Sequence, residues 1–415
     1  MKKYGCIGKK LTHSFSKEIH EKLADYEYGL IELSEEEIKP FFEKKEFNAI
    51  NVTIPYKQTV IPYLDSISDI AKRIGAVNTV VNKGGKLYGY NTDYYGMKAL
   101  IERVGLDLKE KKVLVLGTGG TSKTARAVAT DLGAREILTV SRRKSDDSIT
   151  YDEAVKLHAD AEIIINTTPS GMFPDCDSKP IDITPFKKLS GVIDAVYNPL
   201  CTNLVLDAKA RGIKAEGGLY MLVMQAVVAV EKFLDTEISR DTADKVFASV
   251  LAAKENIVLT GMPGSGKSTV GKRIKIDGYE FIDTDAEIEK RCGCAIKELI
   301  EKSGEKAFRD LESEVIREVS LQGGRIISTG GGAILREENV RYLKRNGKLF
   351  FIDAKLSRLH ATSDRPLSDT YEKLAKLYAE RSGIYKSTAD VTVPDMKTPK
   401  AEADYILSKR MELIL

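Results

Sequence analysis

The sequence has 415 residues, which is too many for one ordinary hydrophobic core and indicates at least two domains. Its 42% hydrophobic and 30% charged residues are typical of a folded globular protein and exclude a disordered or fibrous chain. Lys and Arg number 64 against 61 Asp and Glu, and this even balance argues against a protein that binds nucleic acid or a membrane surface.

No leader and no membrane span is predicted. The first residues carry lysines without an apolar segment behind them, which is unlike a signal peptide. The most apolar stretch, 221–230, is interrupted by Gln225 and is too short to cross a bilayer. Five cysteines fit reduced thiols, and the neighbours Cys292 and Cys294 lack the second pair that a zinc site needs. We therefore expect a cytoplasmic protein that acts on small molecules, with its oligomeric state left open.

Short β-branched runs alternate with helical patterns through most of the chain. The runs are 111–117, 135–141, 161–167, 191–197, 256–261, 279–285, 324–330 and 347–354. This rhythm predicts an α/β fold, with parallel sheets joined by crossover helices. Units of strand, glycine loop and helix begin at Val113 and Ile257, and each unit is expected to found its own sheet. A helix over 243–254 leads straight into the second unit, which places the junction near 253–255.

Two segments of the first hundred residues suit chemistry at a ketone. The segment 51–57, NVTIPYK, ends a predicted strand with Lys57, and the segment 91–93, NTD, ends another short run with Asp93. A lysine paired with an aspartate can give a proton to a carbonyl oxygen as hydride reaches its carbon. Either charge taken alone also fits an exposed surface position.

The serines at 14 and 16 follow the first predicted strand, beside His13. Their hydroxyls could bind a carboxylate. They could equally cap the helix that the following residues predict.

A glycine-rich turn after the strand at 113–116 predicts a dinucleotide site. The turn opens a helix, and a helix N-terminus can bind a pyrophosphate, although a plain glycine turn looks the same. The next strand ends in Ser141, Arg142 and Arg143, where an NAD enzyme usually has an acid. Arginines at that place favour the 2′-phosphate of NADP, and a solvated charge run is the alternative.

The segment 261–268, GMPGSGKS, matches the phosphate loop that follows a strand and precedes a helix. Its glycines let backbone N–H groups turn toward phosphates, Lys267 supplies a charge, and Ser268 supplies a hydroxyl for magnesium. Asp283 and Asp285 end the next strand, where one could hold magnesium and the other could accept a proton. Capping of the helix that follows is the alternative for this pair.

Arginines and glycines of the last third complete the second set. Arg309, Arg365 and Arg381 could each fork onto a carboxylate or phosphate, although single arginines are more often surface residues. The glycines at 330–332 follow a strand directly and allow the backbone to approach a ligand closely.

Residues 256–415, with these motifs in this order, resemble shikimate kinase. The resemblance implies a P-loop domain like the nucleoside-monophosphate kinases over 255–415, using ATP and Mg²⁺. It implies that shikimate is held by Asp285, Arg309, Gly331, Gly332 and Arg381. It further implies that the nucleotide is bound by Gly264, Ser265, Gly266, Lys267, Ser268, Thr269, Arg358 near adenine and Arg365 from a closing lid, with magnesium on Ser268 and Asp283. Lys267, Asp285 and Arg365 would be the catalytic groups.

Residues 4–254 resemble shikimate dehydrogenase through the serine pair and the motifs NVTIPYK, GAVNT, GYNTD, NTTPSGM and GGLYMLVMQA, together with the dinucleotide loop. The resemblance implies a substrate lobe of 1–94 with 220–254 and a Rossmann-type NADP lobe of 95–219. It implies that Lys57 and Asp93 are catalytic and that the substrate is surrounded by Ser14, Ser16, Thr53, Asn78, Asp93, Tyr197 and Gln225. NADP would touch Gly117, Gly119, Gly120, Thr121, Ser141, Arg142, Arg143 and Gly218.

The two resemblances support each other, because the product of one reaction is the substrate of the other. They predict reduction of 3-dehydroshikimate by NADPH and then phosphorylation of shikimate to shikimate 3-phosphate by ATP. One rival is a quinate-preferring NAD dehydrogenase fused to a kinase for another polyol, against which Arg142 and Arg143 argue. The other rival is that one half has become a regulatory or structural module without chemistry.

Overall fold

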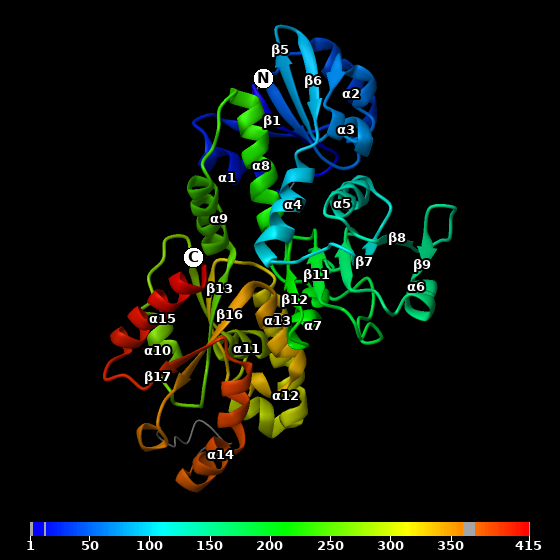
Figure 1. Cartoon of the computed structure of the whole chain (residues 1–415). Coiled ribbons are helices and arrows are strands. Elements are labelled where there is room, and N and C mark those ends of the chain that lie inside the picture. Colours follow the sequence, from blue (N-terminus) through cyan, green and yellow to red (C-terminus); the bar gives the residue numbers. More distant parts are fainter. Residues whose placement is uncertain (1–2, 12–13, 360–369, 415) are drawn as a thin grey trace. The chain divides into compact units, whose positions relative to one another are not determined.

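The computed structural model describes residues 3–11, 14–359 and 370–414. The chain divides into two compact units, 1–250 and 251–415, and the division falls inside helix α9 (Arg240–Lys254) (Figure 1). Two residues singled out from the sequence, His13 and Arg365, lie outside the described residues. None of the helices within the described ranges is both long and apolar enough to cross a membrane.

The first sheet of unit 1 is mixed, with strand order β2-β1-β3-β5-β6-β4. Strand β1 runs parallel to β2 and β3, whereas β5 runs antiparallel to β3 and β6. The antiparallel hairpin turns at Gly84 and Gly85, whose φ values of 61° and 82° suit glycine. This hairpin is an exception to the predicted parallel pairing. The strands are β1 (Tyr4–Gly8), β2 (Tyr28–Glu32), β3 (Ala49–Val52), β4 (Ser66–Ile67), β5 (Thr79–Lys83) and β6 (Lys86–Tyr90).

The second sheet of unit 1 is parallel throughout, with strand order β12-β11-β10-β7-β8-β9. Counted along the chain this is the Rossmann order, and the strand order reverses between β7 and β10. All five residues of β7 are buried, as expected for a parallel strand covered on both faces. The strands are β7 (Lys112–Leu116), β8 (Glu136–Ser141), β9 (Ile149–Thr150), β10 (Ile163–Asn166), β11 (Gly191–Asp194) and β12 (Lys214–Glu216).

Helices join and cover these two sheets. We call the first sheet with α1 to α4 and α8 the first lobe, and the second sheet with α5 to α7 the second lobe. Several helices start at side-chain caps, such as Ser68, whose Oγ accepts from the backbone N–H of Ala71 at 3.3 Å. The helices are α1 (Ser16–Leu23), α2 (Glu35–Lys44), η1 (Ile61–Tyr63), α3 (Asp69–Ile74), α4 (Asp93–Val104), α5 (Gly120–Asp131), α6 (Tyr151–Leu157), α7 (Asn203–Ala210) and α8 (Leu219–Leu234).

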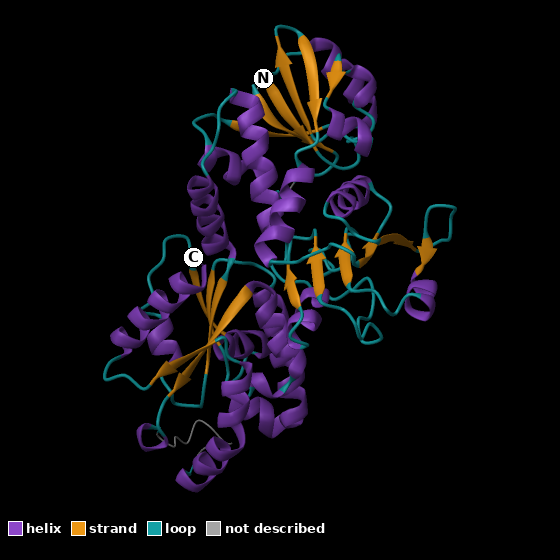
Figure 2. Ribbon diagram, in the orientation of Figure 1, coloured by secondary structure: helices purple, strands orange, loops and turns teal. Residues whose placement is uncertain are grey.

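Unit 2 has one parallel sheet with strand order β14-β15-β13-β16-β17. Helices cover both faces of this sheet (Figure 2), and each face has its own buried apolar cluster. The strands are β13 (Asn256–Thr260), β14 (Glu280–Asp283), β15 (Arg325–Ser328), β16 (Gly347–Asp353) and β17 (Val391–Pro394). The helices are α10 (Lys267–Gly271), α11 (Thr284–Cys292), α12 (Ile296–Ser320), η2 (Ala333–Leu335), α13 (Glu337–Asn346), η3 (Leu356–Arg358), α14 (Tyr371–Thr388) and α15 (Pro399–Ile414).

Candidate functional site

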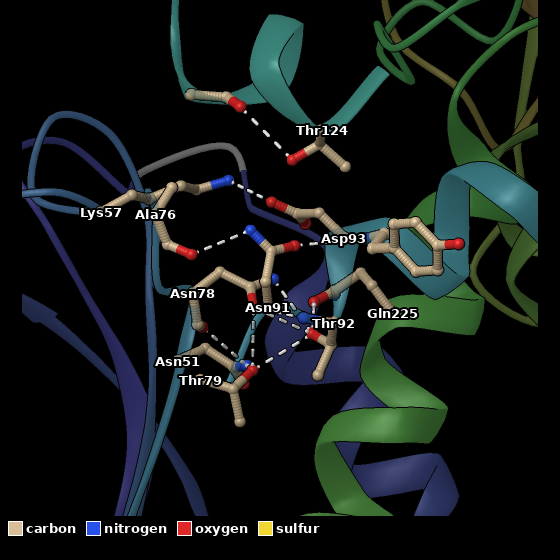
Figure 3. Close-up of polar contacts among 12 residues, drawn as sticks. Asn51, Lys57, Ala76, Asn78, Thr79, Asn91, Thr92, Asp93, Thr124 and Gln225 are labelled. Carbon is tan, nitrogen blue, oxygen red and sulfur yellow. Dashed lines mark hydrogen bonds and ion pairs between the residues drawn. The ribbon is translucent and has the colours of Figure 1, made fainter. Parts of the chain in front are cut away.

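In unit 1, Lys57 and Asp93 form a close ion pair (Figure 3). Nζ of Lys57 lies 2.6 Å from Oδ2 of Asp93, and the two side chains are only 14% and 10% exposed. Lys57 stands in the turn after β3, and Asp93 is the first residue of α4. The structure therefore brings the two predicted catalytic residues together at the carboxyl end of β3. A partly buried pair of this kind can hold and deliver one proton at a defined place.

A buried amide network lies beside this pair and centres on Thr92 (Figure 3). The Thr92 hydroxyl lies 3.0 Å from Nδ2 of Asn78, 3.1 Å from the Thr79 hydroxyl and 3.3 Å from Oε1 of Gln225. The backbone N–H of Thr92 donates to Oδ1 of Asn78 at 2.7 Å. Asn78 and Gln225, both predicted substrate ligands, are thus held in one network by a threonine that the sequence reasoning did not assign.

A second layer of polar residues lies behind this network. Tyr28 is fully buried, and its hydroxyl donates to Oδ1 of Asn51 at 2.7 Å. Asn51 in turn donates to the hydroxyl of Thr79 at 3.1 Å. His20 stacks on Tyr28 with ring centroids 4.0 Å apart, and burial lowers the pKa of His20 to about 3, so its ring is neutral. No local sequence signal links Tyr28 or His20 to the site.

The other predicted substrate residues of the first lobe lie near its surface. Ser14 and Ser16 are half-buried, and the Oγ of Ser14 accepts from the backbone N–H of Ser16 at 3.3 Å. Neither residue is the N-cap of α1, which is Phe15 and has no side-chain cap. The Ser14 hydroxyl nevertheless accepts from the first N–H of α1, so both the capping role and the predicted carboxylate role stay open. Thr53 is half-buried in the segment after β3.

Tyr197 comes from the second lobe and follows β11. Its ring lies 5.2 Å from the ring of Phe15 in the first lobe. Burial raises the pKa of Tyr197 to about 12, so its hydroxyl is protonated and can donate a hydrogen bond.

The dinucleotide turn joins β7 to α5 at the point where the strand order reverses. Gly117 has φ 106°, and a Cβ on it would lie 2.9 Å from Oγ1 of Thr167, so only glycine suits this position. Gly119 is the N-cap of α5 and has open space where a Cβ would point, which leaves room for a phosphate at the helix start. Thr121 stands in the first turn of α5.

Gly120, the first residue of α5, faces Lys57 of the first lobe. A Cβ on Gly120 would lie 3.7 Å from Cδ of Lys57. The dinucleotide turn and the Lys57–Asp93 pair therefore belong to one site within unit 1.

Three basic residues follow β8, of which one is paired with an acidic residue. Lys144 pairs with Glu153 at 2.5 Å, whereas Arg142 and Arg143 are exposed and form no ion pair with the residues that the structure describes. The Ser141 hydroxyl donates to the backbone carbonyl of Arg143, which holds the segment in a turn. Two open guanidinium groups at this end of the sheet suit a phosphate.

Gly218 is required for packing. A Cβ on Gly218 would collide with the backbone of Ala195, and the N–H of Gly218 donates to the Val196 carbonyl at 2.8 Å. Its predicted contact with NADP stays a prediction.

The phosphate loop of unit 2 turns between β13 and α10. Lys267 is 8% exposed, and its Nζ donates to the backbone carbonyls of Gly261 and Met262, each at 2.9 Å. Three glycines give the loop its shape: Gly261, Gly264 and Gly266 have φ of 149°, 80° and 89°. The lysine is thus held against its own loop, whose positive-φ glycines let backbone N–H groups turn toward a phosphate.

Acidic residues stand beside the end of this loop. Ser268 donates to Oδ2 of Asp283 at 2.5 Å, so the two predicted magnesium ligands are adjacent. Oδ1 of Asp283 accepts from the backbone N–H groups of Asp285 and Ala286 at 3.1 and 3.4 Å, so Asp283 also caps α11. Burial, and secondly the charge of Asp283, raises the pKa of Asp285 to about 6. A carboxylate of this kind is suited to accept a proton near neutral pH.

A cavity of about 620 Å³ is lined by the phosphate loop, Asp283, Asp285, Arg309, Arg381 and the glycines 330–332. Nη1 of Arg381 donates to the Gly331 carbonyl at 3.0 Å, and Nη1 of Arg309 pairs with Glu312 at 2.8 Å. Gly332 needs to lack a Cβ, because one there would overlap the Arg309 guanidinium. All five residues predicted to hold shikimate therefore face one cavity.

Glu312 is a cavity residue to which the sequence reasoning gave no role. It is 0% exposed and lies one helical turn after Arg309 in α12, a spacing that signals a side-chain pair. The Glu312 carboxylate pairs with the Arg309 guanidinium, which is itself predicted to bind the carboxylate of shikimate.

Ser265 and Gly266 lie in the phosphate loop, and Thr269 lies in α10 directly after it. Their contacts with the nucleotide stay predictions. Arg358 lies on η3, away from the loop in sequence, and its Nη1 donates to the Met396 carbonyl at 2.7 Å and pairs with Asp395. A role for Arg358 beside adenine stays a prediction, as does the lid role of Arg365.

The two neighbouring cysteines carry no metal site in the part of the chain that the structure describes. Cys292 and Cys294 are free thiols with sulfurs 3.6 Å apart. Across the described ranges, no group of three or more His, Cys, Asp or Glu side chains could hold a metal ion.

Comparison with known proteins matches two different families to two parts of the chain. Residues 6–80 match the family model of the shikimate dehydrogenase substrate-binding domain, and residues 263–411 match the shikimate kinase model. A shikimate dehydrogenase (NADP⁺) of Clostridium beijerinckii is 36% identical over 263 residues, which cover 60% of this chain and 97% of the relative.

Solved structures give the same result for the first part of the chain. A shikimate dehydrogenase crystal structure from Peptoclostridium difficile is 34% identical with a TM-score of 0.57, covering 60% of this chain and 98% of that one. A Thermus thermophilus shikimate 5-dehydrogenase, solved with NADP(H) and shikimate, is 26% identical with a TM-score of 0.53, covering 60% of this chain and 99% of that one.

Proposed function

The chain belongs to the shikimate dehydrogenase family over the 60% that matches its relatives and carries a shikimate kinase domain after it, and we propose that it catalyses both reactions. It would reduce 3-dehydroshikimate to shikimate with NADPH and phosphorylate shikimate to shikimate 3-phosphate with ATP. The observation that carries the first assignment is the Lys57–Asp93 pair at 2.6 Å, which lies beside the start of the dinucleotide helix.

In the first reaction, Lys57 would donate a proton to the carbonyl oxygen of 3-dehydroshikimate, and Asp93 would orient the ammonium group. NADPH supplies the hydride when it is bound. Asn78 and Gln225, fixed by the Thr92 hydroxyl, would hold the ring hydroxyls, while Ser14 and Ser16 would bind the carboxylate. A preformed network limits the side-chain reorganisation that substrate binding requires.

In the second reaction, Asp285 would accept the proton of the attacking hydroxyl, which its raised pKa supports. Arg309 and Arg381 would hold the shikimate carboxylate, with Arg309 fixed by Glu312. Lys267 would leave its carbonyl partners and balance charge on the transferred phosphoryl group of ATP.

The residues present fit the expected cofactors. Open space at Gly119 and the exposed Arg142 and Arg143 suit the pyrophosphate and 2′-phosphate of NADP. The neighbouring oxygens of Ser268 and Asp283 suit Mg²⁺, which prefers oxygen ligands and phosphates. None of the five cysteines, all of which the structure describes, forms a disulfide, which supports the expectation of a reducing, cytoplasmic location.

Both rivals are opposed by particular residues. An NAD-dependent quinate dehydrogenase is disfavoured by the open arginines that follow β8. A half without chemistry is disfavoured because Lys57 lies 2.6 Å from Asp93 in one half, and Lys267 and Asp285 line one cavity in the other.

A coupled assay tests the proposal with 3-dehydroshikimate, NADPH, ATP and magnesium. We expect NADPH consumption, and ADP release that depends on NADPH unless shikimate is added. Lys57→Ala should abolish the first signal and keep ADP release from added shikimate, whereas Lys267→Ala should do the reverse. NADPH consumption without any ADP release would contradict the kinase assignment, and the absence of both signals would contradict the whole proposal.

A further inference from the structure

Helix α5 contacts the first lobe at both of its ends. At its first residue, Gly120 faces Lys57. At its last residue, Asp131 binds Arg73 of α3, with Nη1–Oδ1 at 2.9 Å and Nη2–Oδ2 at 2.5 Å. An α-helix of this length spans about 18 Å, so two well-separated contacts fix the orientation of α5 on the first lobe.

Tyr94 completes the contact at Asp131. Its hydroxyl donates to Oδ2 of Asp131 at 2.5 Å, and its ring centroid lies 5.8 Å from Cζ of Arg73. Tyr94 is 7% exposed and directly follows Asp93 in α4. The side chain that binds the end of α5 is therefore one peptide bond away from the proposed catalytic carboxylate.

Asp131 carries a charge that is locally unfavourable at the end of a helix. A carboxylate in the last turn of a helix faces the negative end of the helix dipole, where a basic residue is favoured. Hydrogen bonds from Arg73, and secondly from Tyr94, lower the pKa of Asp131 below its ordinary value, so the carboxylate stays charged. A residue that is unfavourable locally is expected to serve a tertiary contact.

We propose that Asp131 is a positioning residue of the dehydrogenase, which binds Arg73 and Tyr94 and thereby fixes the dinucleotide helix relative to the Lys57–Asp93 pair. Hydride transfer requires reacting atoms about 3–3.5 Å apart, and a misplacement of about 1 Å can cost about 100-fold in rate. Asp131 stands at the opposite end of α5 from the dinucleotide turn, so it acts through the helix. The proposal rests on the dehydrogenase activity proposed above.

The test compares Asp131→Arg, Arg73→Asp and the double exchange in the full chain. Each single change puts like charges together, and we expect kcat for 3-dehydroshikimate reduction to fall about tenfold or more. The primary isotope effect, measured with NADPH deuterated at the transferred position, should rise because hydride transfer becomes slower relative to product release. The double exchange should recover most of the lost kcat and the ordinary isotope effect, since it restores the ion pair in reverse.

Arg126→Glu is the matched control, because Arg126 is an exposed charge on the same helix. It should leave kcat, the isotope effect and hydrogen exchange of α5 unchanged. The proposal is overturned if the single variants keep the wild-type kcat and isotope effect, or if the double exchange is no better than Asp131→Arg.

Hydrogen exchange gives a readout that does not depend on turnover. Amides of α3 and α5 should exchange faster in each single variant and return to wild-type rates in the double exchange. Unchanged exchange in the single variants would overturn the anchoring role even if the wild-type protein reduced a different ketone. Failure of the wild-type protein to consume NADPH with 3-dehydroshikimate would instead contradict the proposed function.

Discussion

Asp285 and Glu312 point one carboxylate oxygen each at the same place beside Gly330. A Cβ on Gly330 would lie 2.6 Å from Oδ1 of Asp285 and 2.8 Å from Oε1 of Glu312. Both oxygens are buried and have no hydrogen-bond partner among the described residues. Burial is the main cause that raises the pKa of each carboxyl. The negative charges of Asp283 and Glu312 add to the rise at Asp285, whereas the charge of Lys267 lowers it.

This arrangement predicts an acidic limb in the pH profile of the kinase. Asp285 must be ionised to accept a proton, and its pKa is raised to about 6. We expect kcat/KM for shikimate to fall about tenfold per pH unit below that value. Glu312→Gln should move the midpoint to lower pH, because it removes a nearby negative charge. Dehydrogenase activity of the same variant is the control, and an unshifted midpoint would contradict the coupling between the two carboxyls.

The raised pKa of Asp285 also predicts how the stability of unit 2 depends on pH. The pKa of Asp285 rises from 3.8 to about 6 on folding, so between these values the folded state binds more protons than the unfolded state. Stability contributed by this group is therefore greatest at low pH and falls as pH rises through that window. Asp285→Asn should stabilise unit 2 at pH 7 by up to about 3 kcal/mol and have little effect near pH 4. Calorimetry of the wild-type protein and the variant at pH 7 and at pH 4 measures these two effects. The unit 2 transition is identified by its shift on adding ATP.

Local sequence features predicted most strands of the second lobe and of unit 2, the two glycine loops, and residues that line the cavity of unit 2. The turns at Gly117 and Gly266 could be predicted because both residues have positive φ, which glycine adopts most readily. The groups that orient the site were missed, because their partners are far away in the chain. Thr92 meets Gln225 across 133 residues, and Arg73 meets Asp131 across 58. The role of Glu312 could have been predicted from the sequence, because Glu312 follows Arg309 by one helical turn.

Thr92 is predicted to control substrate affinity in the dehydrogenase. Thr92→Val removes the hydroxyl that contacts Asn78 and Gln225 and leaves buried amides unpaired, which costs about 1–3 kcal/mol. We expect KM for 3-dehydroshikimate to rise about tenfold or more and the unfolding midpoint of unit 1 to fall. Thr92→Ser keeps the hydroxyl and should stay near wild type. A loss in Thr92→Ser, with Thr92→Val near wild type, would show that the methyl group, and not the hydrogen bonds, matters.

The open arginines after β8 predict the preference between the two nicotinamide cofactors. Replacing Arg142 and Arg143 by Ala removes the groups proposed to bind the 2′-phosphate, and each charge-assisted contact is worth about 1.5–3 kcal/mol. We expect kcat/KM for NADPH to fall about tenfold or more while kcat/KM for NADH changes little, because NADH has no 2′-phosphate. Lys144→Ala is the matched control, since Lys144 is already paired with Glu153 and should change neither value by more than about twofold. An equal fall with both cofactors would indicate that the arginines support the turn itself, and it would return the NAD-dependent alternative to consideration.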